Sequence, residues 1–145
     1  MAIAKDLLKD RTVGMVFSVG PDESVQEAVN LLAEHNVGAL LVMDMKGIVE
    51  GIFSERDVVR KVGLNGTSAE ETKVRDVMTS KVIYVEADQS IEECMALMDD
   101  KSIRHLPVYE KGTLLGLISI RDVLRAVISE QKVFITHLEH YIRGG

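Results

Sequence analysis

The feature that most constrains this chain is that it repeats itself. Residues 16–42 align without a gap with residues 82–108, at an offset of 66 positions. One residue is then lost, and "GIFSERDVVRKV" at 51–62 aligns with "GLISIRDVLRAV" at 116–127 at an offset of 65. Self-similarity over this length predicts two copies of one structural unit rather than a single irregular fold.

The segments that lead into the two copies also correspond, as "AKDLL" from residue 4 and "VRDVM" from residue 74. Between the copies lies "GLNGTSAEETK", which is polar and rich in small residues, as linkers are. The predicted boundaries are residues 1–62 for the first copy with its lead-in, 63–73 for the linker, 74–128 for the second copy and 129–145 for a C-terminal amphipathic helix.

Each copy shows the same order of expected elements. A short β-rich run opens it at 16–19 or 82–85, and a Ser-x-x-Glu capping box, beginning at Ser24 or Ser90, then predicts the start of a helix. Two apolar runs joined by a glycine-containing turn follow, and a second helix begins at the end of the second run. The expected fold is therefore of the α/β (α+β) class, with two β-α-β-β-α repeats. Aromatic residues make up only 4% of the chain, so the core must be aliphatic.

The last segment of the chain has no counterpart after the first copy. Its apolar residues fall on one face of a predicted helix: Phe134, Ile135, Leu138, Tyr141 and Ile142. An unmatched amphipathic helix must cover the module or meet a partner chain.

Composition narrows the function classes. The 145 residues carry a formal net charge of −6, which argues against nucleic-acid binding through a broad basic surface. Cys94 is the only cysteine, so the chain has no intramolecular disulfide and no thiol-rich metal site. Its beginning lacks the apolar core of a secretory signal, and no apolar run is long enough for a membrane span. We therefore expect a cytoplasmic protein that does not bind membranes.

The repeated phrase, Gly-x-x-Ser-x-Arg-Asp, contains a Ser-x-x-Asp pattern at an expected junction of strand and helix. Such a pattern is commonly a helix cap, because the hydroxyl accepts from a free amide and the carboxylate complements the positive helix end. The same geometry suits a nucleoside phosphate, since the amides and the hydroxyl can meet phosphate and the carboxylate can accept both hydroxyls of a ribose. Gly51 and Gly116 lead into the phrase where a side chain could obstruct a ligand. One occurrence favours the cap, and its repetition favours a ligand site.

The second copy adds positive charge beside the phrase. Arg104 and His105 precede the strand that contains Pro107, and arginine is a natural partner for phosphate. The first copy has Gly38 and Ala39 at the equivalent positions, so any phosphate clamp is asymmetric.

These motifs resemble a tandem CBS domain pair (named for cystathionine β-synthase), also called a Bateman module. The resemblance runs from residue 4 to about residue 128 and rests on "VRDVMTSKVIYVEADQSIEECMALM", "IRHLPV" and "GLISIRDVL" in combination. "GIFSERDVVRKV" and the tail "LEHYI" are similar to the subgroup in which the CBS pair is the entire protein. The resemblance implies two units packed about a pseudo-twofold, clefts between them that bind adenine nucleotides, and homodimers.

Site residues follow from the resemblance by position in the motifs. It implies ribose binding by Asp57 and Asp122; phosphate or ribose binding by Ser54, Ser119, Arg104, His105, Arg56 and Arg121; and an adenine pocket near Val16, Val82, Ile83 and Pro107.

Other signals indicate no further chemistry. The chain contains neither a Walker A sequence nor G-x-G-x-x-G. His137 and His140 lie on one predicted helix face, where a solvated helix is the better interpretation than a metal site. Cys94 falls on an apolar helix face, which favours inert packing. No set of nucleophile, base and orienting group stands out, so we expect no catalysis, no metal and no required cofactor.

The leading functional hypothesis is a non-catalytic sensor that binds AMP, ATP or NAD(H) and acts on a separate, unidentified partner protein. The alternative is a ligand-free scaffold, in which the repeat and the C-terminal helix serve dimerisation or partner docking. A small enzyme that consumes the nucleotide is a third and weaker hypothesis.

Overall fold

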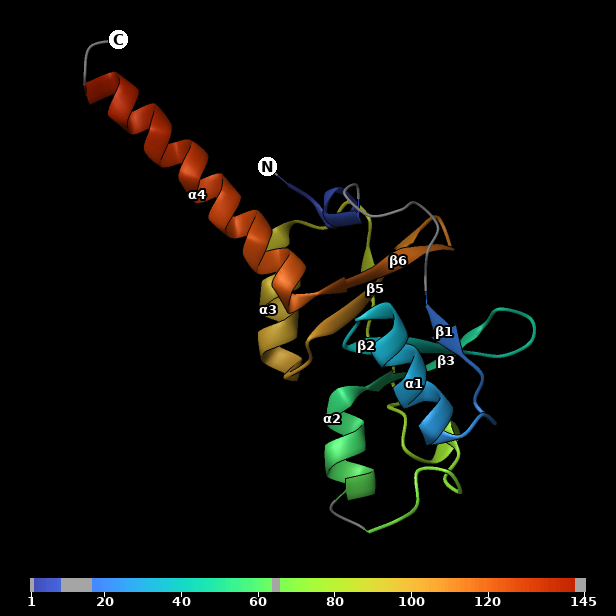
Figure 1. The fold of residues 1–145 in the computed structure, drawn as a ribbon. Coiled ribbons are helices and arrows are strands. Elements are labelled where there is room, and N and C mark those ends of the chain that lie inside the picture. Colours follow the sequence, from blue (N-terminus) through green and yellow to red (C-terminus); the bar gives the residue numbers. More distant parts are fainter. Residues whose placement is uncertain (1, 9–16, 64–65, 143–145) are drawn as a thin grey trace. The chain divides into compact units, whose positions relative to one another are not determined.

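The computed structural model describes residues 2–8, 17–63 and 66–142 (Figure 1). The chain divides into two compact units: unit 1 is Met1–Met15 with Ile83–Gly145, and unit 2 is Val16–Val82. Each unit is therefore built from one copy of the repeat together with the lead-in of the other copy. This division by contact differs from the division by repeat that the sequence predicts.

Unit 2 contains a three-stranded sheet in the order β1-β2-β3. β1 is parallel to β2, and β3 is antiparallel to it. Its elements are β1 (Ser18–Val19), α1 (Val25–His35), β2 (Ala39–Met43), β3 (Val49–Ser54), α2 (Glu55–Asp57), a π-helical turn (Val58–Gly63) and a 3₁₀ turn (Val74–Asp76).

Unit 1 has the same plan, with a sheet in the order β4-β5-β6 and the same strand directions. Its elements are a 3₁₀ turn (Ala4–Leu8), β4 (Val85–Glu86), α3 (Ile91–Lys101), β5 (His105–Glu110), β6 (Thr113–Ser119) and α4 (Ile120–Ile142). The predicted β-α-β-β-α order is confirmed in both copies.

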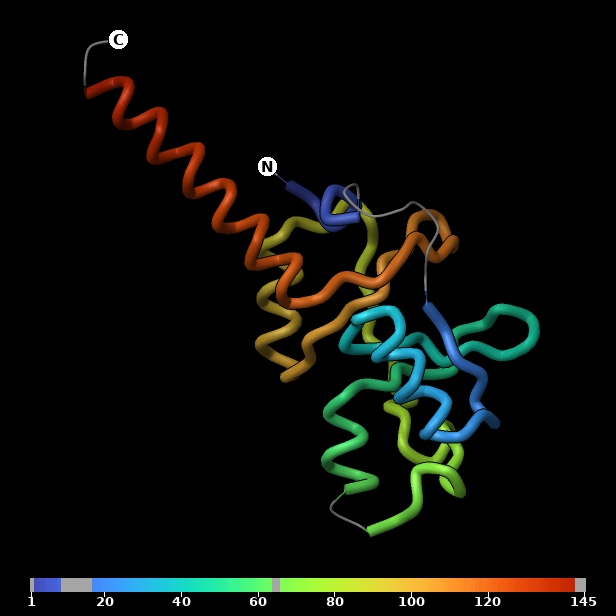
Figure 2. The backbone as a smooth tube through the Cα atoms, in the orientation of Figure 1, coloured from blue at the N-terminus to red at the C-terminus, as the bar shows by residue number. Residues whose placement is uncertain are grey.

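The one-residue difference between the copies lies in the turn between the second and third strands. Figure 2 shows the backbone path of both turns. In unit 1, Lys111 and Gly112 connect the strands with φ of 51° and 80°, as in a two-residue type I′ hairpin. In unit 2 the corresponding turn is one residue longer, and the Asp44 amide donates to the Ile48 carbonyl at 3.0 Å to close it. The insertion is absorbed in a turn, so the strand register on either side is preserved.

The predicted serine caps begin both first helices, and the reciprocal capping box forms in α3, where the Ser90 amide donates to Glu93 Oε1 at 3.5 Å. The Ser24 hydroxyl accepts from the Glu27 amide at 3.1 Å, and the Ser90 hydroxyl accepts from the Glu93 amide at 3.1 Å. From these starts, one face of each helix reaches the sheet. The fully or nearly fully buried helical residues are Val25, Ala28 and Leu32 in α1, and Ile91, Cys94 and Met98 in α3.

The lead-ins are held by matching hydrogen bonds. In unit 1, the Ala4 amide donates to the Gln89 carbonyl at 2.8 Å. In unit 2, the Val74 amide donates to the Glu23 carbonyl at 2.9 Å. Ala4 and Val74 are both fully buried, so each lead-in completes the core of the unit formed by the other copy.

The second helix of unit 1 and the expected C-terminal helix are one continuous helix, α4, without a break near residue 128. Nothing in its sequence stops it, since residues 120–142 contain neither Gly nor Pro. At the equivalent point in unit 2 the helical segment ends at Gly63, which aligns with Ile128. Within the described residues, no helix has both the length and the apolar character needed to cross a membrane.

Burial predicts that Cys94 is unreactive in the folded protein. The residue is 0% exposed, and burial, with the nearby Glu93 charge as a smaller cause, raises the pKa of its thiol. Because the thiolate is the reactive form, alkylation by iodoacetamide at pH 7.5 should be at least tenfold slower in buffer than in 8 M urea, an order-of-magnitude expectation. Equal rates in the two solvents would contradict the buried placement.

Candidate functional site

In unit 1 the repeated phrase folds into a strand end and a helix start. Ser119 closes β6, and the Asp122 carboxylate Oδ2 accepts from the Ser119 amide at 2.8 Å and from its hydroxyl at 3.1 Å. The Asp122 amide in turn donates to the Ser119 hydroxyl at 3.2 Å. Asp122 is only 8% exposed. The pattern is thus a reciprocal helix cap, as the first interpretation of the phrase predicts.

In unit 2 the same phrase caps α2 and carries an added cation. Asp57 Oδ2 accepts from the Ser54 amide at 2.9 Å and from its hydroxyl at 3.3 Å. Lys61 Nζ lies 3.3 Å from the other oxygen, Oδ1, and also donates to the Val77 carbonyl at 2.8 Å. Ala126 stands at the position of unit 1 that aligns with Lys61. The carboxylate of unit 2 is therefore part of a bridge to the second lead-in.

Arg104 and His105 adjoin the capped helix start of unit 1. His105 pairs with Ser119 across β5 and β6, and the Ile120 amide donates to the Arg104 carbonyl at 2.8 Å. Directly opposed residues on antiparallel strands project from the same face of the sheet. The structure therefore brings the Arg104 backbone, His105, Ser119 and Asp122 together in one unit.

Unit 2 makes the same backbone contacts without the same side chains. Ala39 pairs with Ser54, and the Glu55 amide donates to the Gly38 carbonyl at 3.1 Å. The predicted asymmetry in positive charge is thus present at equivalent positions of the two units.

The remaining predicted residues have varied surroundings. Arg121 is exposed on α4, whereas Arg56 is half-buried in α2. Pro107 is buried in β5 opposite Leu117. Val82 and Ile83 are half-buried in the segment before β4, whose strand begins at Val85, and Val16 lies outside the described residues.

The glycines of the phrase have close neighbours within their own units. A Cβ atom at Gly51 would lie 2.7 Å from Met78 Sδ and 2.8 Å from the Thr79 carbonyl oxygen. A Cβ atom at Gly116 would lie 3.0 Å from a methyl carbon of Leu8. Both glycines make room for a lead-in, and their neighbours within the unit already account for the absence of a side chain.

Sequence reasoning missed the Lys61 bridge, although a signal was present. Lysine four residues after an aspartate in a helical segment is a standard ion-pair spacing, and the second copy lacks it. The hydrogen bond to Val77 had no local signal, because it joins residues 16 positions apart.

The bridge predicts a measurable effect on stability. Lys61→Met removes the cation beside Asp57, which is 7% exposed, and a donor to the Val77 carbonyl. The lysine side chain itself is 43% exposed, so solvent screens the pair and the expected loss is about 1 kcal/mol of unfolding free energy. Urea denaturation measures it.

Lys73→Met is the matched control. Lys73 Nζ lies 3.9 Å from Asp22 in a pair whose side chains are 59% and 67% exposed, and removing it should change stability by less than about 0.5 kcal/mol. Equal effects of the two substitutions would show that the Lys61 bridge is no stronger than a surface pair.

No group of three or more His, Cys, Asp or Glu side chains among the described residues is arranged to hold a metal ion. His137 and His140 are both exposed on α4.

Comparison with known proteins places this geometry in a family. The CBS domain model matches the chain at residues 5–63 and again at 74–129. The mitochondrial CBS domain-containing protein CBSX3 of Arabidopsis thaliana is 41% identical over 128 residues, which are 86% of this chain and 62% of that protein's length.

Solved structures agree with the sequence match. A putative signal-transduction protein with CBS domains from Burkholderia ambifaria is 43% identical, with a TM-score of 0.85 over 90% of this chain and 96% of that one. A hexameric CBS-CP12 protein from bloom-forming cyanobacteria is 27% identical, with a TM-score of 0.74 over 86% of this chain and 70% of that one. With two matches of the model and two β-α-β-β-α copies, this chain belongs to the CBS-domain family as a tandem pair.

Proposed function

We propose that this protein is a non-catalytic regulatory module that binds an adenine nucleotide (AMP, ATP or NAD(H)) and signals to a partner protein. The observation that carries the proposal is the cluster in unit 1. There the Ser119–Asp122 cap lies beside Arg104 and His105, through the β5–β6 register and the Ile120–Arg104 hydrogen bond. A carboxylate suits the two hydroxyls of a ribose, and a guanidinium suits phosphate.

The stronger nucleotide-binding site in this proposal is in unit 1. Asp122 takes the ribose, Arg104 and His105 take phosphate with Ser119, and Arg121 is a weaker phosphate contact. The adenine lies near Val82, Ile83 and Pro107, with Val16 as a further candidate.

The corresponding binding site of unit 2 is weaker in this proposal. It is composed of Ser54, Arg56 and Asp57, and Lys61 already lies on its carboxylate. Gly38 and Ala39 replace the two cationic residues, so phosphate has fewer partners there.

The same proposal includes a homodimer in the cytoplasm as the working form. Assembly has a precedent, since the CBS-CP12 relative is described as a hexamer. Nucleotide binding would act by favouring one arrangement of the units or of the dimer over another, and a partner protein would respond to it.

Isothermal titration calorimetry with AMP, ATP, NADH and S-adenosylmethionine tests the proposal. We expect heat from at least one adenine nucleotide, with saturation at one strong site per chain. Silence across the panel at 100 μM protein would overturn the nucleotide sensor.

One observation favours a second candidate function, a ligand-free scaffold. The C-terminal half of α4 exposes large apolar side chains that a nucleotide-binding module does not require. Deletion of residues 130–145 distinguishes this role: a scaffold built on α4 would change its oligomeric state, and an unchanged state would count against it.

A further inference from the structure

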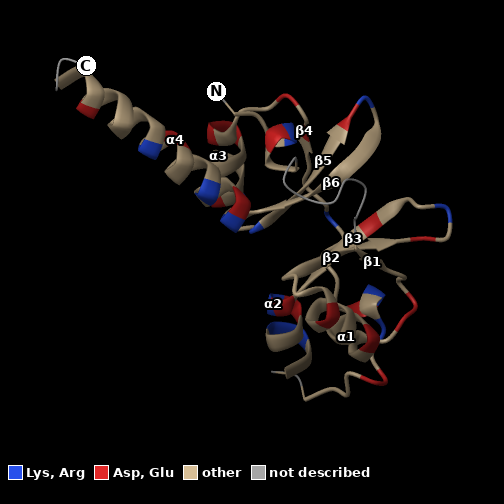
Figure 3. Cartoon of the chain, turned by 45° about the horizontal axis from the view of Figure 1, so that its top comes forward, with Lys and Arg blue, Asp and Glu red and all other residues tan. Residues whose placement is uncertain are grey.

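Helix α4 carries an exposed apolar stripe of seven residues along most of its length. Its members are each 44–82% exposed: Leu124, Ile128, Phe134, Ile135, Leu138, Tyr141 and Ile142. Figure 1 shows this helix running past α3 and away from β5 and β6 of its own unit. Figure 3, which colours the ribbon by charged residue type, shows little charge along its last turns, where Glu139 is the only Asp, Glu, Lys or Arg between residues 133 and 142. An apolar face of this length marks an interface.

The spacing of the stripe indicates the kind of partner. Positions 124, 127, 131, 134, 138 and 141 alternate steps of three and four, which is the a/d pattern of a helix that packs along another helix. Ile128, Ile135 and Ile142 follow at seven-residue intervals beside that seam. The pattern spans about 26 Å of helix, at 1.5 Å per residue. A second long helix is therefore the matching occupant.

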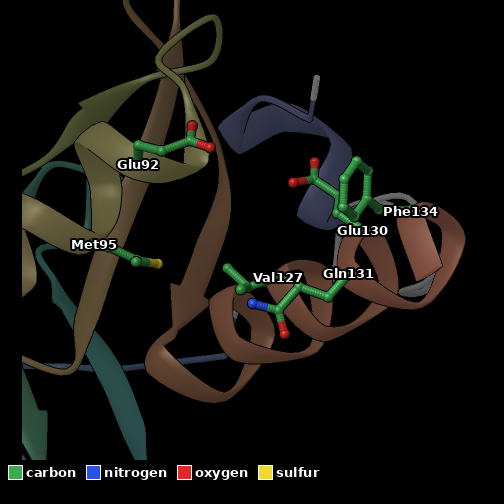
Figure 4. Close-up of a pocket in the computed structure, with 6 residues that line it drawn as sticks. All are labelled: Glu92, Met95, Val127, Glu130, Gln131 and Phe134. Atoms are coloured by element: carbon green, nitrogen blue, oxygen red, sulfur yellow. The ribbon is translucent and has the colours of Figure 1, made fainter. Parts of the chain in front are cut away.

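The stripe continues into a pocket beside α3. The pocket has a volume of about 310 Å³ and is lined by Glu92, Met95, Val127, Glu130, Gln131 and Phe134. Figure 4 shows Met95 of α3 and Val127 of α4 facing the space between the two helices. The apolar floor accepts a large side chain, whereas Glu92 and Glu130 on its border favour a hydrogen-bond donor in the occupant.

We propose that the occupant is α4 of a second copy, packed antiparallel about a twofold axis near residues 132 and 133. In this register each a residue meets a d residue, so that Leu124 faces the partner's Tyr141 and Gln131 faces the partner's Phe134. Ile128 lies beside the partner's Ile135. The inference gives the homodimer of the proposed function a specific interface, and it does not depend on nucleotide binding.

Charge complementarity selects the antiparallel orientation. Two-fold antiparallel packing places the g positions of the two helices side by side, which sets Glu130 against the partner's His137, twice per dimer. An imidazole N–H can donate to that carboxylate. Parallel packing would instead set Glu130 against the partner's Ile135. It would also place identical residues opposite each other, Phe134 against the partner's Phe134 and Tyr141 against the partner's Tyr141. The partner's Phe134, opposite Gln131, is also the side chain that the antiparallel register brings to the pocket.

Two substitutions test the interface without touching the core of unit 1. Leu138→Asp and Ile135→Asp alter exposed residues, so each chain should fold with an unchanged circular dichroism spectrum. Sedimentation equilibrium of the full chain at 50 μM should give twice the chain mass for the native protein and the single-chain mass for both variants. A native monomer, or variants that remain dimers, would overturn the proposal.

Disulfide trapping tests the orientation. In a Cys94→Ala background, for which the aligned Ala28 shows that alanine fits this helix face, Leu124→Cys and Tyr141→Cys chains are oxidised separately and as a mixture. Antiparallel packing predicts cross-linked dimer only in the mixture. Cross-linked dimer in the unmixed Tyr141→Cys sample would establish parallel packing and overturn the register.

A dimer that forms and cross-links as described while calorimetry stays silent would leave this interface intact and remove only the nucleotide sensor. A monomer that binds AMP would overturn this interface and leave the nucleotide sensor intact.

Discussion

Gly51→Ala is expected to lower the unfolding free energy by about 3 kcal/mol, in the upper range for a side chain forced into a packed site. The new Cβ would lie 2.8 Å from the Thr79 carbonyl oxygen. That carbonyl cannot withdraw easily, because it accepts from the Ile52 amide at 3.0 Å while the Thr79 amide donates to the Ile52 carbonyl at 2.9 Å. Urea denaturation monitored by circular dichroism measures the loss.

Gly116→Ala is the matched control for this prediction. The atoms nearest to its new Cβ would be the two methyl carbons of Leu8, at 3.0 and 3.3 Å, and those methyl groups can rotate away. We expect a loss of about 1 kcal/mol or less. A larger effect at Gly116 than at Gly51 would mean that the lead-in of unit 1 is the more rigid of the two.

Asp122→Ala is expected to weaken the binding of a ribose-bearing nucleotide roughly 30-fold or more, because removing a carboxylate that accepts hydroxyl hydrogen bonds costs about 2 kcal/mol. The same substitution removes a helix cap, so about 1 kcal/mol of stability should also be lost. Titration is therefore made at a temperature where circular dichroism shows the variant fully folded. Unchanged affinity would show that Asp122 is only a cap.

Asp57→Ala tests which of the two units holds the stronger nucleotide-binding site. It removes the equivalent cap and the partner of Lys61, and it should cost at least as much stability as Asp122→Ala. If the stronger nucleotide-binding site is in unit 1, the affinity measured at that site should change less than threefold. If Asp57→Ala lost binding and Asp122→Ala kept it, the stronger nucleotide-binding site would be in unit 2.

Much of the fold could be predicted because its signals are local. The serine caps at Ser24 and Ser90 act over three residues, and the apolar spacing of α1 and α3 acts over single helical turns. The strand pairs were recognisable because a short turn joins them. The repeat then allowed each element to be read twice, so a weak signal in one copy was supported by the other.

The candidate site was predictable in part for the same reason. The Ser-x-x-Asp caps form within one helical turn, and the alignment of the copies identified Arg104 and His105 as additions to the second copy. Their proximity to Ser119 was not contained in the local pattern. It follows from the register of β5 and β6, which the length of the Lys111–Gly112 turn sets.

By itself, the sequence determined that this protein has two β-α-β-β-α copies, where their helices begin, and which copy carries the extra positive charge. Only the tertiary structure decided that each lead-in completes the other copy's unit and that Gly51 and Gly116 serve this packing. It also decided that Lys61 ties Asp57 to Val77. The reason is distance along the chain. Caps and helical faces depend on neighbours within four residues, whereas Ala4 and Gln89 are 85 positions apart and meet only when the whole unit has formed.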